Sequence, residues 1–403
     1  MGNADRIPSE PERQRWLTRG VGGVGAASAL SDLGHEVPTS LLPAFLTSTL
    51  GAPAAALGVI EGIADGLAGA AKLVGGAPAN DPERRRQTVV GGYATTAVLS
   101  SAIGLATSVW QVGLLRTGAW IARGLRTPSR NALLADLVHP SAYGRAYGFE
   151  RMMDNLGAIG GPLVALALVA VVDVRTAILL SVVPGLLAVG AIVVAVREAP
   201  RGERRRSEPL RIRVRPVLRG RLGRLFIGVG AFEVGNAAAT LLVLRTTELL
   251  EPSRGHDSAV QTAIALYAAY NVAATLSSLP AGHWLDRAGP LRVLGTGVAA
   301  FALAYGGFAV SGPSVPLLAA LFVLAGIGIG LVETGESAAV ASLARDGLRG
   351  SAFGLLGATQ SFGNLAASAV AGALWTLLSA EVAFAYLAAW MVVSLAGLAL
   401  ARP

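Results

Sequence analysis

Long apolar stretches separated by short polar gaps dominate the chain. A transmembrane helix needs about 20 mainly apolar residues, and twelve stretches satisfy this requirement. They lie at 16–48, 54–75, 88–108, 110–137, 143–170, 174–196, 222–248, 258–281, 290–311, 314–344, 350–375 and 378–401. The pattern therefore predicts an all-α membrane protein with twelve transmembrane helices, and an even number of spans puts both termini on one side.

The polar gaps differ in charge. Two of them are rich in arginine, at 76–87 and 197–221, whereas three others hold no basic residue, at 49–53, 109 and 312–313. Cytoplasmic loops of membrane proteins carry an excess of Lys and Arg. We therefore expect the basic gaps and both termini to be cytoplasmic, in a chain that lies in the inner (plasma) membrane of a bacterial-type cell.

The basic gap at 197–221 divides the spans six and six. This predicts a first half at 16–196, a cytoplasmic linker at 197–221 and a second half at 222–403. Residues 1–15 are mostly polar and lack the basic-then-apolar pattern of a cleavable signal. We interpret them as a cytoplasmic tail.

The two halves repeat one another at a constant offset of 206 residues. The segment YGRAYGFERMMDNLG at 143–157 aligns with RGSAFGLLGATQSFG at 349–363. The matched pairs are Gly144 with Gly350, Gly148 with Gly354, Gly157 with Gly363, Gly76 with Gly282, Arg86 with Arg292, and Gly124 with Gly330. Two parallel six-helix halves with a substrate site between them are a known transporter plan.

Composition supports the membrane class and argues against others. The chain is 53% hydrophobic and 14% charged, whereas soluble domains are usually about 25% charged. The net charge of +8 does not indicate nucleic-acid binding, because the arginines lie mainly in gaps between spans. Cysteine is absent, which excludes thiolate metal sites, and no Walker loop, paired-histidine metal motif or G-x-S-x-G elbow occurs. We expect neither an enzyme nor a cofactor.

Motifs in two gaps and in the fourth span resemble the major facilitator superfamily. The gap sequence AGHWLDRAGPLRVLG supplies Gly282, Asp286, Arg287, Gly289 and Arg292, and its repeat GAPANDPERRR supplies Gly76, Asn80, Asp81, Arg84 and Arg85. The fourth span carries Arg116, Gly124, Pro128 and Asp136. The resemblance implies that the gap glycine lets two helices approach and that an aspartate ties the loop to a neighbouring helix. Asn80 stands at the usual aspartate position, with Asp81 as a candidate substitute.

The fifth span carries a glycine pattern of its own. Gly148, Gly157, Gly161 and Pro162 resemble the signature of exporters in this superfamily that work as antiporters. The alternative interpretation is that these small residues only allow helices to pack closely.

Charged residues inside the spans are functional candidates, because charge is costly in hydrocarbon. Several occur three or four residues apart, which puts them on one helical face: Asp32 with Glu36, Glu61 with Asp65, Glu150 with Asp154, Glu333 with Glu336, and Arg123 with Arg126. We expect Arg126 or Arg130 to neutralise Glu150 or Asp154, with Arg151 at similar depth. Such ion pairs can equally be structural or gate the cytoplasmic mouth.

The resemblance also implies that the first, fourth, seventh and tenth spans line a central cavity. These spans carry the proton- or substrate-site candidates Asp32, His35, Glu36, Glu233, Glu333 and Glu336. An acid desolvated beside a second acid can carry a proton at physiological pH. His35 can relay protons, since a free histidine titrates near about 6.5, or it is a packing residue. Pro38 and Pro43 should bend the helix beyond this stretch.

These observations predict a secondary transporter that exports a small solute by proton antiport and alternating access. The acidic residues favour a cationic or amphipathic drug-like substrate, as in multidrug efflux, and we expect a monomer in the lipid bilayer. A divalent-metal exporter of the nickel type is the nearest alternative. A membrane solute receptor or a lipid-modifying membrane enzyme is a more distant one, because a receptor does not need two acid-bearing halves and an enzyme should show a nucleophile or a metal motif.

Overall fold

The computed structural model describes residues 16–53, 55–200, 211–345 and 347–401, and their regular structure is entirely helical. The predicted tail at 1–15 and residues 201–210 of the predicted linker lie outside the described residues. The first half contains α2 (Arg19–Ala44), α3 (Ala55–Ala79), α4 (Pro82–Ala102), α5 (Val109–Asp136), α6 (Tyr143–Val169), α7 (Val174–Leu180) and α8 (Val182–Glu198). After a short α9 (Val214–Val217), the second half contains α10 (Gly220–Gly235), α11 (Thr240–Arg254), α12 (His256–Ala288), α13 (Pro290–Val310), α14 (Val315–Leu343), α15 (Arg349–Leu377) and α16 (Ala380–Leu400).

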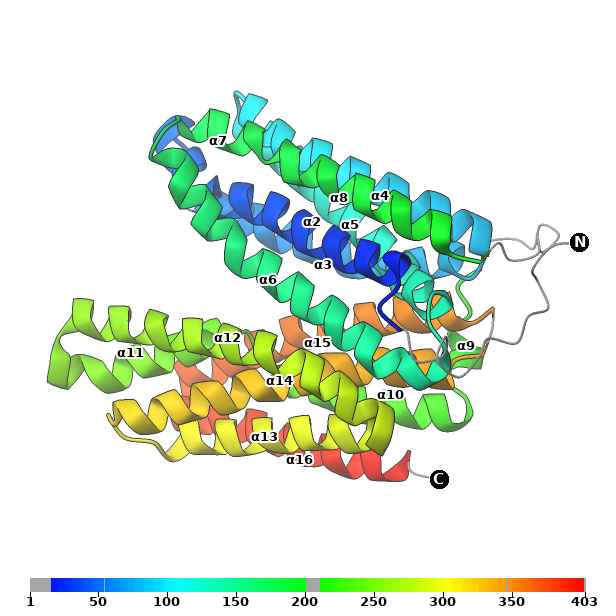
Figure 1. The fold of residues 1–403 in the computed structure, drawn as a ribbon. Helices are drawn as coiled ribbons and strands as arrows, with labels where there is room; N and C mark the ends of the chain where they lie inside the picture. The colour runs from blue at the N-terminus through cyan, green and yellow to red at the C-terminus, as the bar shows by residue number, and fades with distance from the viewer. Residues whose placement is uncertain (1–15, 54, 201–210, 346, 402–403) are drawn as a thin grey trace, which may run out of the picture.

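These helices form two bundles of six spans each (Figure 1). The prediction of twelve membrane-spanning segments in two halves is confirmed, with α7 and α8 together making the sixth span and α10 and α11 the seventh. Pro38 and Pro43 lie inside α2, and a π-helical turn follows them at Phe45–Thr49. The regular helix therefore ends soon after the prolines.

Among the described residues, eight helical segments are long and apolar enough to cross a membrane by length and composition alone. The spans that fall short of this criterion are α2, α3, α5 and α15. They are also the spans that carry many of the polar and charged side chains lining the central cavity described below. Their low apolarity reflects a face that meets the cavity rather than lipid.

Several helix ends lie beyond the predicted span limits, because capping extends helices past the apolar stretch. The third span was predicted from 88, yet α4 begins at Pro82, where the Asp81 side chain accepts the backbone N–H of Glu83 and Arg84. Likewise α12 continues to Ala288 instead of ending at 281, and Gly289 follows with a φ of 84°. That left-handed conformation favours glycine. The predicted loop motifs are thus mostly helical.

The seventh span was predicted as one helix at 222–248, but it is interrupted between α10 and α11. Side chains of α15 bind the non-helical backbone: Asn364 donates to the carbonyl oxygen of Asn236 at 2.7 Å, and Ser368 accepts the N–H of Ala238 at 2.8 Å. An interruption inside a membrane is tolerated where such partners replace the lost helical hydrogen bonds. The break lies three residues beyond Glu233.

The halves touch where glycines let the backbones meet. A Cβ at Gly76 of α3 would lie 2.8 Å from the carbonyl oxygen of Gly350 in α15, and one at Gly282 of α12 would lie 2.7 Å from the carbonyl carbon of Gly144 in α6. These contacts are reciprocal in the repeat, since Gly282 corresponds to Gly76 and Gly350 to Gly144. The start of α2 and the end of α16 lie at the same end as these contacts, and the halves diverge toward the end of α7 and α11 (Figure 1).

A methyl group at Gly282 should weaken this closed end. The Gly282→Ala variant places a Cβ against Gly144 and 3.1 Å from the Cα of Arg145, and overpacking of this kind typically costs about 1–3 kcal/mol. Disulfide formation between cysteines introduced at Asn80 and Ser351, in the other inter-half contact, should become several-fold slower. Gly295→Ala, which adds a methyl group where there is open space, is the matched control. Equal rates in both variants would contradict this role of Gly282.

Candidate functional site

A cavity of about 700 Å³ lies between the two halves. Its first-half lining includes the cations Lys72, Arg123, Arg126, Arg130 and Arg151 and the acids Glu36, Asp65 and Asp154. The second half contributes Glu233 and Glu333. Its volume is within the range of about 300–1,000 Å³ that is typical of small-molecule sites.

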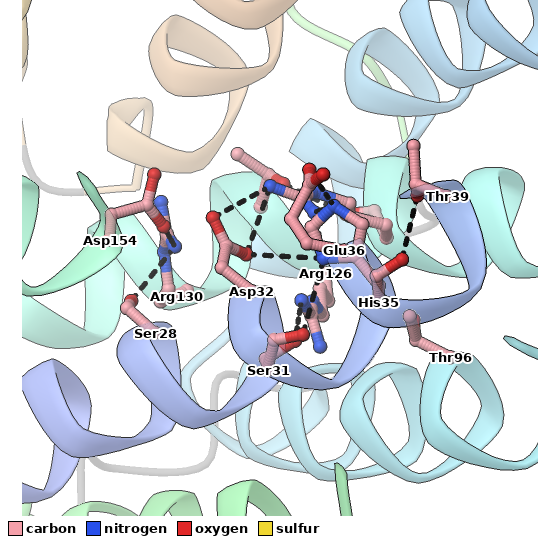
Figure 2. A network of polar contacts seen from close by, with 12 residues as sticks. Ser28, Ser31, Asp32, His35, Glu36, Thr39, Thr96, Arg126, Arg130 and Asp154 are labelled. Carbon is pink, nitrogen blue, oxygen red and sulfur yellow. Dashed lines mark hydrogen bonds and ion pairs between the residues drawn. The ribbon is translucent and has the colours of Figure 1, made fainter. Parts of the chain in front are cut away.

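The stretch of α2 around Asp32 forms a polar network (Figure 2). Asp32 is buried and pairs with Arg123 of α5 at 3.1 Å. The guanidinium of Arg123 also lies against the ring nitrogens of His35, and the His35 Nε2 is 3.1 Å from a Glu36 carboxylate oxygen. The structure therefore brings Asp32, His35 and Glu36 together, with Asp32 tied to an arginine.

His35 lies between the central cavity and a second, very small cavity behind α2. Its Nδ1 is 3.2 Å from the carbonyl oxygen of Ser31, and Trp120 of α5 packs edge-on with ring centres 5.1 Å apart. The small cavity is bounded by hydroxyl groups of Ser31, Thr96, Ser100 and Ser181. The His35 ring thus has polar residues on both sides and packs against Trp120.

Arg130 carries the ion pairs at the next level of the cavity. It lies 2.9 Å from Glu150 and 3.3 Å from Asp154, and Ser28 of α2 donates to Glu150 at 2.8 Å. Arg126 makes neither of these pairs. Its guanidinium lies 3.6 Å from the centre of the Tyr93 ring and donates to Ser31, and its Nη1 has no partner.

At the level of the cavity, an ion-pair chain crosses from the first half to the second. Arg151 of α6 lies 3.1 Å from Asp154 on its own helix and 3.3 Å from Glu333 of α14. Glu333 is therefore tied to the other half. This bridge must break or rearrange if the two halves move apart at this level.

The other two acids of the second half have a different environment. The buried Glu233 accepts a hydrogen bond from Asn236 at 3.2 Å, and Glu336 is fully buried and accepts one from Gln360 at 2.8 Å. Neither makes an ion pair within the part of the chain that the structure describes, and Glu336 Oε1 has no partner. The charges of these two carboxyl groups interact. Asp32 and Glu233 are not equivalent in the packing of the two halves, because Gly157 packs on Ala29 of α2 whereas its repeat Gly363 packs on Glu233 of α10.

Two further predicted acids, Glu61 and Asp65 of α3, contact side chains of α5. Glu61 of α3 lies 3.0 Å from Arg116, whose guanidinium stacks 3.6 Å from the centre of the Trp120 ring. The Trp120 indole N–H donates to Asp65 at 2.7 Å. Trp120 thus connects the cavity wall to both acids of α3.

The loop-motif residues lie at the closed end. Asn80 exchanges two hydrogen bonds with Ser351, at 2.7 and 2.9 Å, while Asp286 accepts the N–H of Gly144 at 2.7 Å and pairs with Arg145. Among the described residues, Asp81 caps α4, and its substitution for the usual aspartate stays a prediction. Asp136 lies between two arginines of the same end, Arg85 and Arg349. Arg84 lies partly exposed on α4, and Arg287 and Arg292 are exposed.

The glycines of the fifth span fit α6 against α2 and α12. Gly148 faces the backbone of Ser278, Gly157 that of Ala29, and Gly161 the Glu36 side chain. Pro162 follows within the same helix. Close packing accounts for these contacts, and one of them positions Glu36.

Sequence reasoning missed Lys72. It is the chain's single lysine among 33 basic residues, it lines the cavity from α3, and its ammonium donates to Ser361 of α15 at 2.8 Å. The signal available in the sequence was that Lys72 is the one lysine in a chain whose other basic residues of this count are arginines. It has no acid three or four residues away on its helix, so a search for paired charges passed over it.

The described residues contain no group of three His, Cys, Asp or Glu side chains placed to hold a metal ion. The acids are instead distributed among arginine pairs and separate walls of the cavity. The structure therefore adds no support to the divalent-metal alternative.

Twelve helices in two repeated halves, joined by reciprocal glycine contacts around a charged cavity, are the plan of a secondary transporter. A sequence model of the family described as Major Facilitator Superfamily matches residues 24–265 and 226–403. The chain belongs to the major facilitator superfamily. It is a multi-pass membrane transporter, which confirms the family and fold that the motifs predicted.

Relatives and solved structures agree with this assignment. The uncharacterised MFS-type transporter MJ1317 of Methanocaldococcus jannaschii is 27% identical over 349 residues, 85% of each chain. A multi-drug resistance efflux pump PmrA homologue of Lactococcus lactis is 31% identical over 87 residues, only 22% of each chain. The crystal structure of the major facilitator transporter FucP in the outward conformation superposes with a TM-score of 0.72 at 16% identity, covering 96% of this chain and 99% of that one. This last likeness shows the shared fold.

Removal of Arg130 should destabilise this major facilitator protein strongly. The Arg130→Ala variant leaves Glu150 and Asp154 without their shared cation, and breaking a buried pair costs about 3–5 kcal/mol. Its thermal unfolding midpoint in detergent should fall well below that of the parent protein, whereas Arg126→Ala should lower it less, because Arg126 makes no ion pair with another described residue. The reverse order would refute the assignment of Arg130 as the centre of the cluster.

Proposed function

We propose that this transporter exports a small solute with a cationic group in exchange for protons, by alternating access. The observation that supports it best is the contrast between the acids of the two halves. In the first half, Asp32, Glu150 and Asp154 are each paired with an arginine. In the second half, Glu233 faces the cavity without an ion-pair partner among the described residues.

An unpaired acid in such a setting suits proton coupling. Burying an isolated charge costs much free energy, so a buried carboxyl group is held either neutral or beside a cation. The charge of the Glu233 carboxylate is neutralised by a bound proton at one stage and by the positive group of a solute at another. Competition between them for one carboxylate would couple the proton gradient to solute movement. We therefore propose Glu233, with Glu336 as its neighbour, as the proton-exchanging group in place of Asp32.

The orientation follows from the arginine-rich gaps. If they face the cytoplasm, the closed end with Asn80 and Asp286 is cytoplasmic, and the cavity opens outward. The partial likeness to an efflux-pump homologue is consistent with export. Before a solute can be expelled, it must enter the cavity from the cytoplasm. This entry requires the glycine contacts at the closed end to open.

Accessibility of single cysteines tests this orientation. The chain has no cysteine, so Glu83→Cys and Ser253→Cys each provide a unique and exposed thiol. In intact cells, an impermeant maleimide should label position 253 at the far end and should not label position 83 until the cells are opened. Labelling of position 83 from outside would overturn the proposed orientation.

Amide replacement tests the proton site. In proteoliposomes, Glu233→Gln mimics the permanently protonated acid, so export driven by a pH gradient should fall at least tenfold while solute-for-solute exchange persists, because exchange needs no proton release. Glu251→Gln, the same change at an exposed position of α11, should leave both activities unchanged.

The same assay separates the two candidate acids. If Asp32 exchanges the proton, Asp32→Asn will show the loss of gradient-driven export with intact exchange, and Glu233→Gln will not. Loss of both activities in Glu233→Gln would assign that residue to solute binding alone. Full gradient-driven export in Glu233→Gln would reject it as the proton site.

A further inference from the structure

Lys72 has more hydrogen-bonding capacity than its surroundings use. An ammonium group has three donors, and among the described residues Lys72 donates one hydrogen bond, to Ser361 across the boundary between the halves. The side chain is partly buried and lines the cavity. Two N–H groups therefore remain for another acceptor in the cavity.

The other cations around the cavity differ from Lys72 in their partners. Arg123, Arg130 and Arg151 are each held by carboxylates, and Arg126 is stacked on Tyr93. Within the described residues Lys72 makes no ion pair. Arg123 and Arg151, which are positive, and Glu233 and Asp65, which are negative, are the charged groups that act on it most strongly.

The internal repeat shows that packing does not require a lysine at this position. The residue that corresponds to Lys72 at the offset of 206 is Ser278, which is fully buried and donates to the carbonyl oxygen of Ala274 on its own helix. The equivalent backbone contacts are kept in both halves, because Gly354 packs on the Lys72 carbonyl and Gly148 on that of Ser278. The same backbone packing therefore forms with a serine at this position, so packing does not depend on the ammonium group of Lys72.

We infer that Lys72 binds an anionic group of the transported solute, so that the cavity accepts a zwitterion with its anionic end at α3 and its cationic end at Glu233 of α10. Only the placement of the cationic end at Glu233 rests on the proposed function. Arg123 and Arg151 add positive potential at the α3 side, where a carboxylate would accept hydrogen bonds from the two unused N–H groups. Such charge-assisted bonds are stronger than neutral ones, and they would favour a zwitterion over the same molecule without its anionic group.

The lone lysine provides a direct test by chemical protection. In detergent and without any gradient, the purified protein is treated with an acetylating reagent, and modification of Lys72 is followed by mass spectrometry. Rhodamine B, which carries a cationic ring system and a carboxylate, is compared with its ethyl ester, which is only cationic. Rhodamine B should protect Lys72 at a concentration at least tenfold lower than the ester, which corresponds to about 1.4 kcal/mol.

Variants identify the group responsible for the discrimination. Dye binding is measured by fluorescence polarisation for the parent protein, Lys72→Met and Lys72→Arg. The preference for rhodamine B should disappear in Lys72→Met and persist in Lys72→Arg, which keeps the charge. Arg292→Met, which removes an exposed positive charge outside the cavity, should keep the preference.

Three outcomes would overturn the inference: equal protection by the two dyes, no protection by either, or an unchanged preference in Lys72→Met. None of these measurements depends on a proton gradient or on transport. Failure of proton coupling would instead appear in the proteoliposome assay with Glu233→Gln. The two proposals can therefore fail separately.

Discussion

Contact between backbones at four glycines is the constraint on which the rest of this structure depends. Gly76 meets Gly350 and Gly282 meets Gly144 so closely that no side chain fits between them. Because the pairs are related by the internal repeat, they close the molecule symmetrically at one end. The hydrogen bonds of Asn80 and Asp286 reach the opposite half only at this separation, as does the Arg151 bridge to Glu333 deeper in the molecule. The cavity exists because the halves meet there and diverge elsewhere.

The charges inside the membrane are arranged around this cavity, and they are not equivalent in the two halves. The first half supplies an excess of arginine, and its acids Asp32, Glu150 and Asp154 are paired with Arg123, Arg130 and Arg151. Buried pairs of this kind contribute little net stability but are costly to break. They hold the first-half wall in a fixed arrangement. Lys72 and Glu233 both line the cavity and make no ion pair among the described residues, so a solute or a proton can engage them.

Much of the fold could be predicted from the sequence, because twelve apolar stretches and a constant repeat offset are local signals. Helix limits were less predictable, since capping by Asp81 extends α4 beyond its apolar stretch. The break in the seventh span depends on Asn364 and Ser368 from a helix more than 120 residues away. For the site, spacing placed Arg126 and Arg130 near the correct helices but did not choose between them. That choice depends on Tyr93 of α4, which provides the ring surface for Arg126.

The interruption between α10 and α11 gives Glu233 a setting that no acid of α2 has. α2 continues past Asp32 and Glu36 to Ala44, with Pro38 and Pro43 inside it, so neither acid lies in the last turn of its helix. Glu233 instead lies in the last turn of α10, which ends at Gly235. The carbonyl end of a helix carries partial negative charge, and this adds to the carboxylate of Glu233 at the cavity wall. A positive group next to Glu233, whether a proton or the cationic end of a solute, is therefore favoured by the backbone as well as by the side chain.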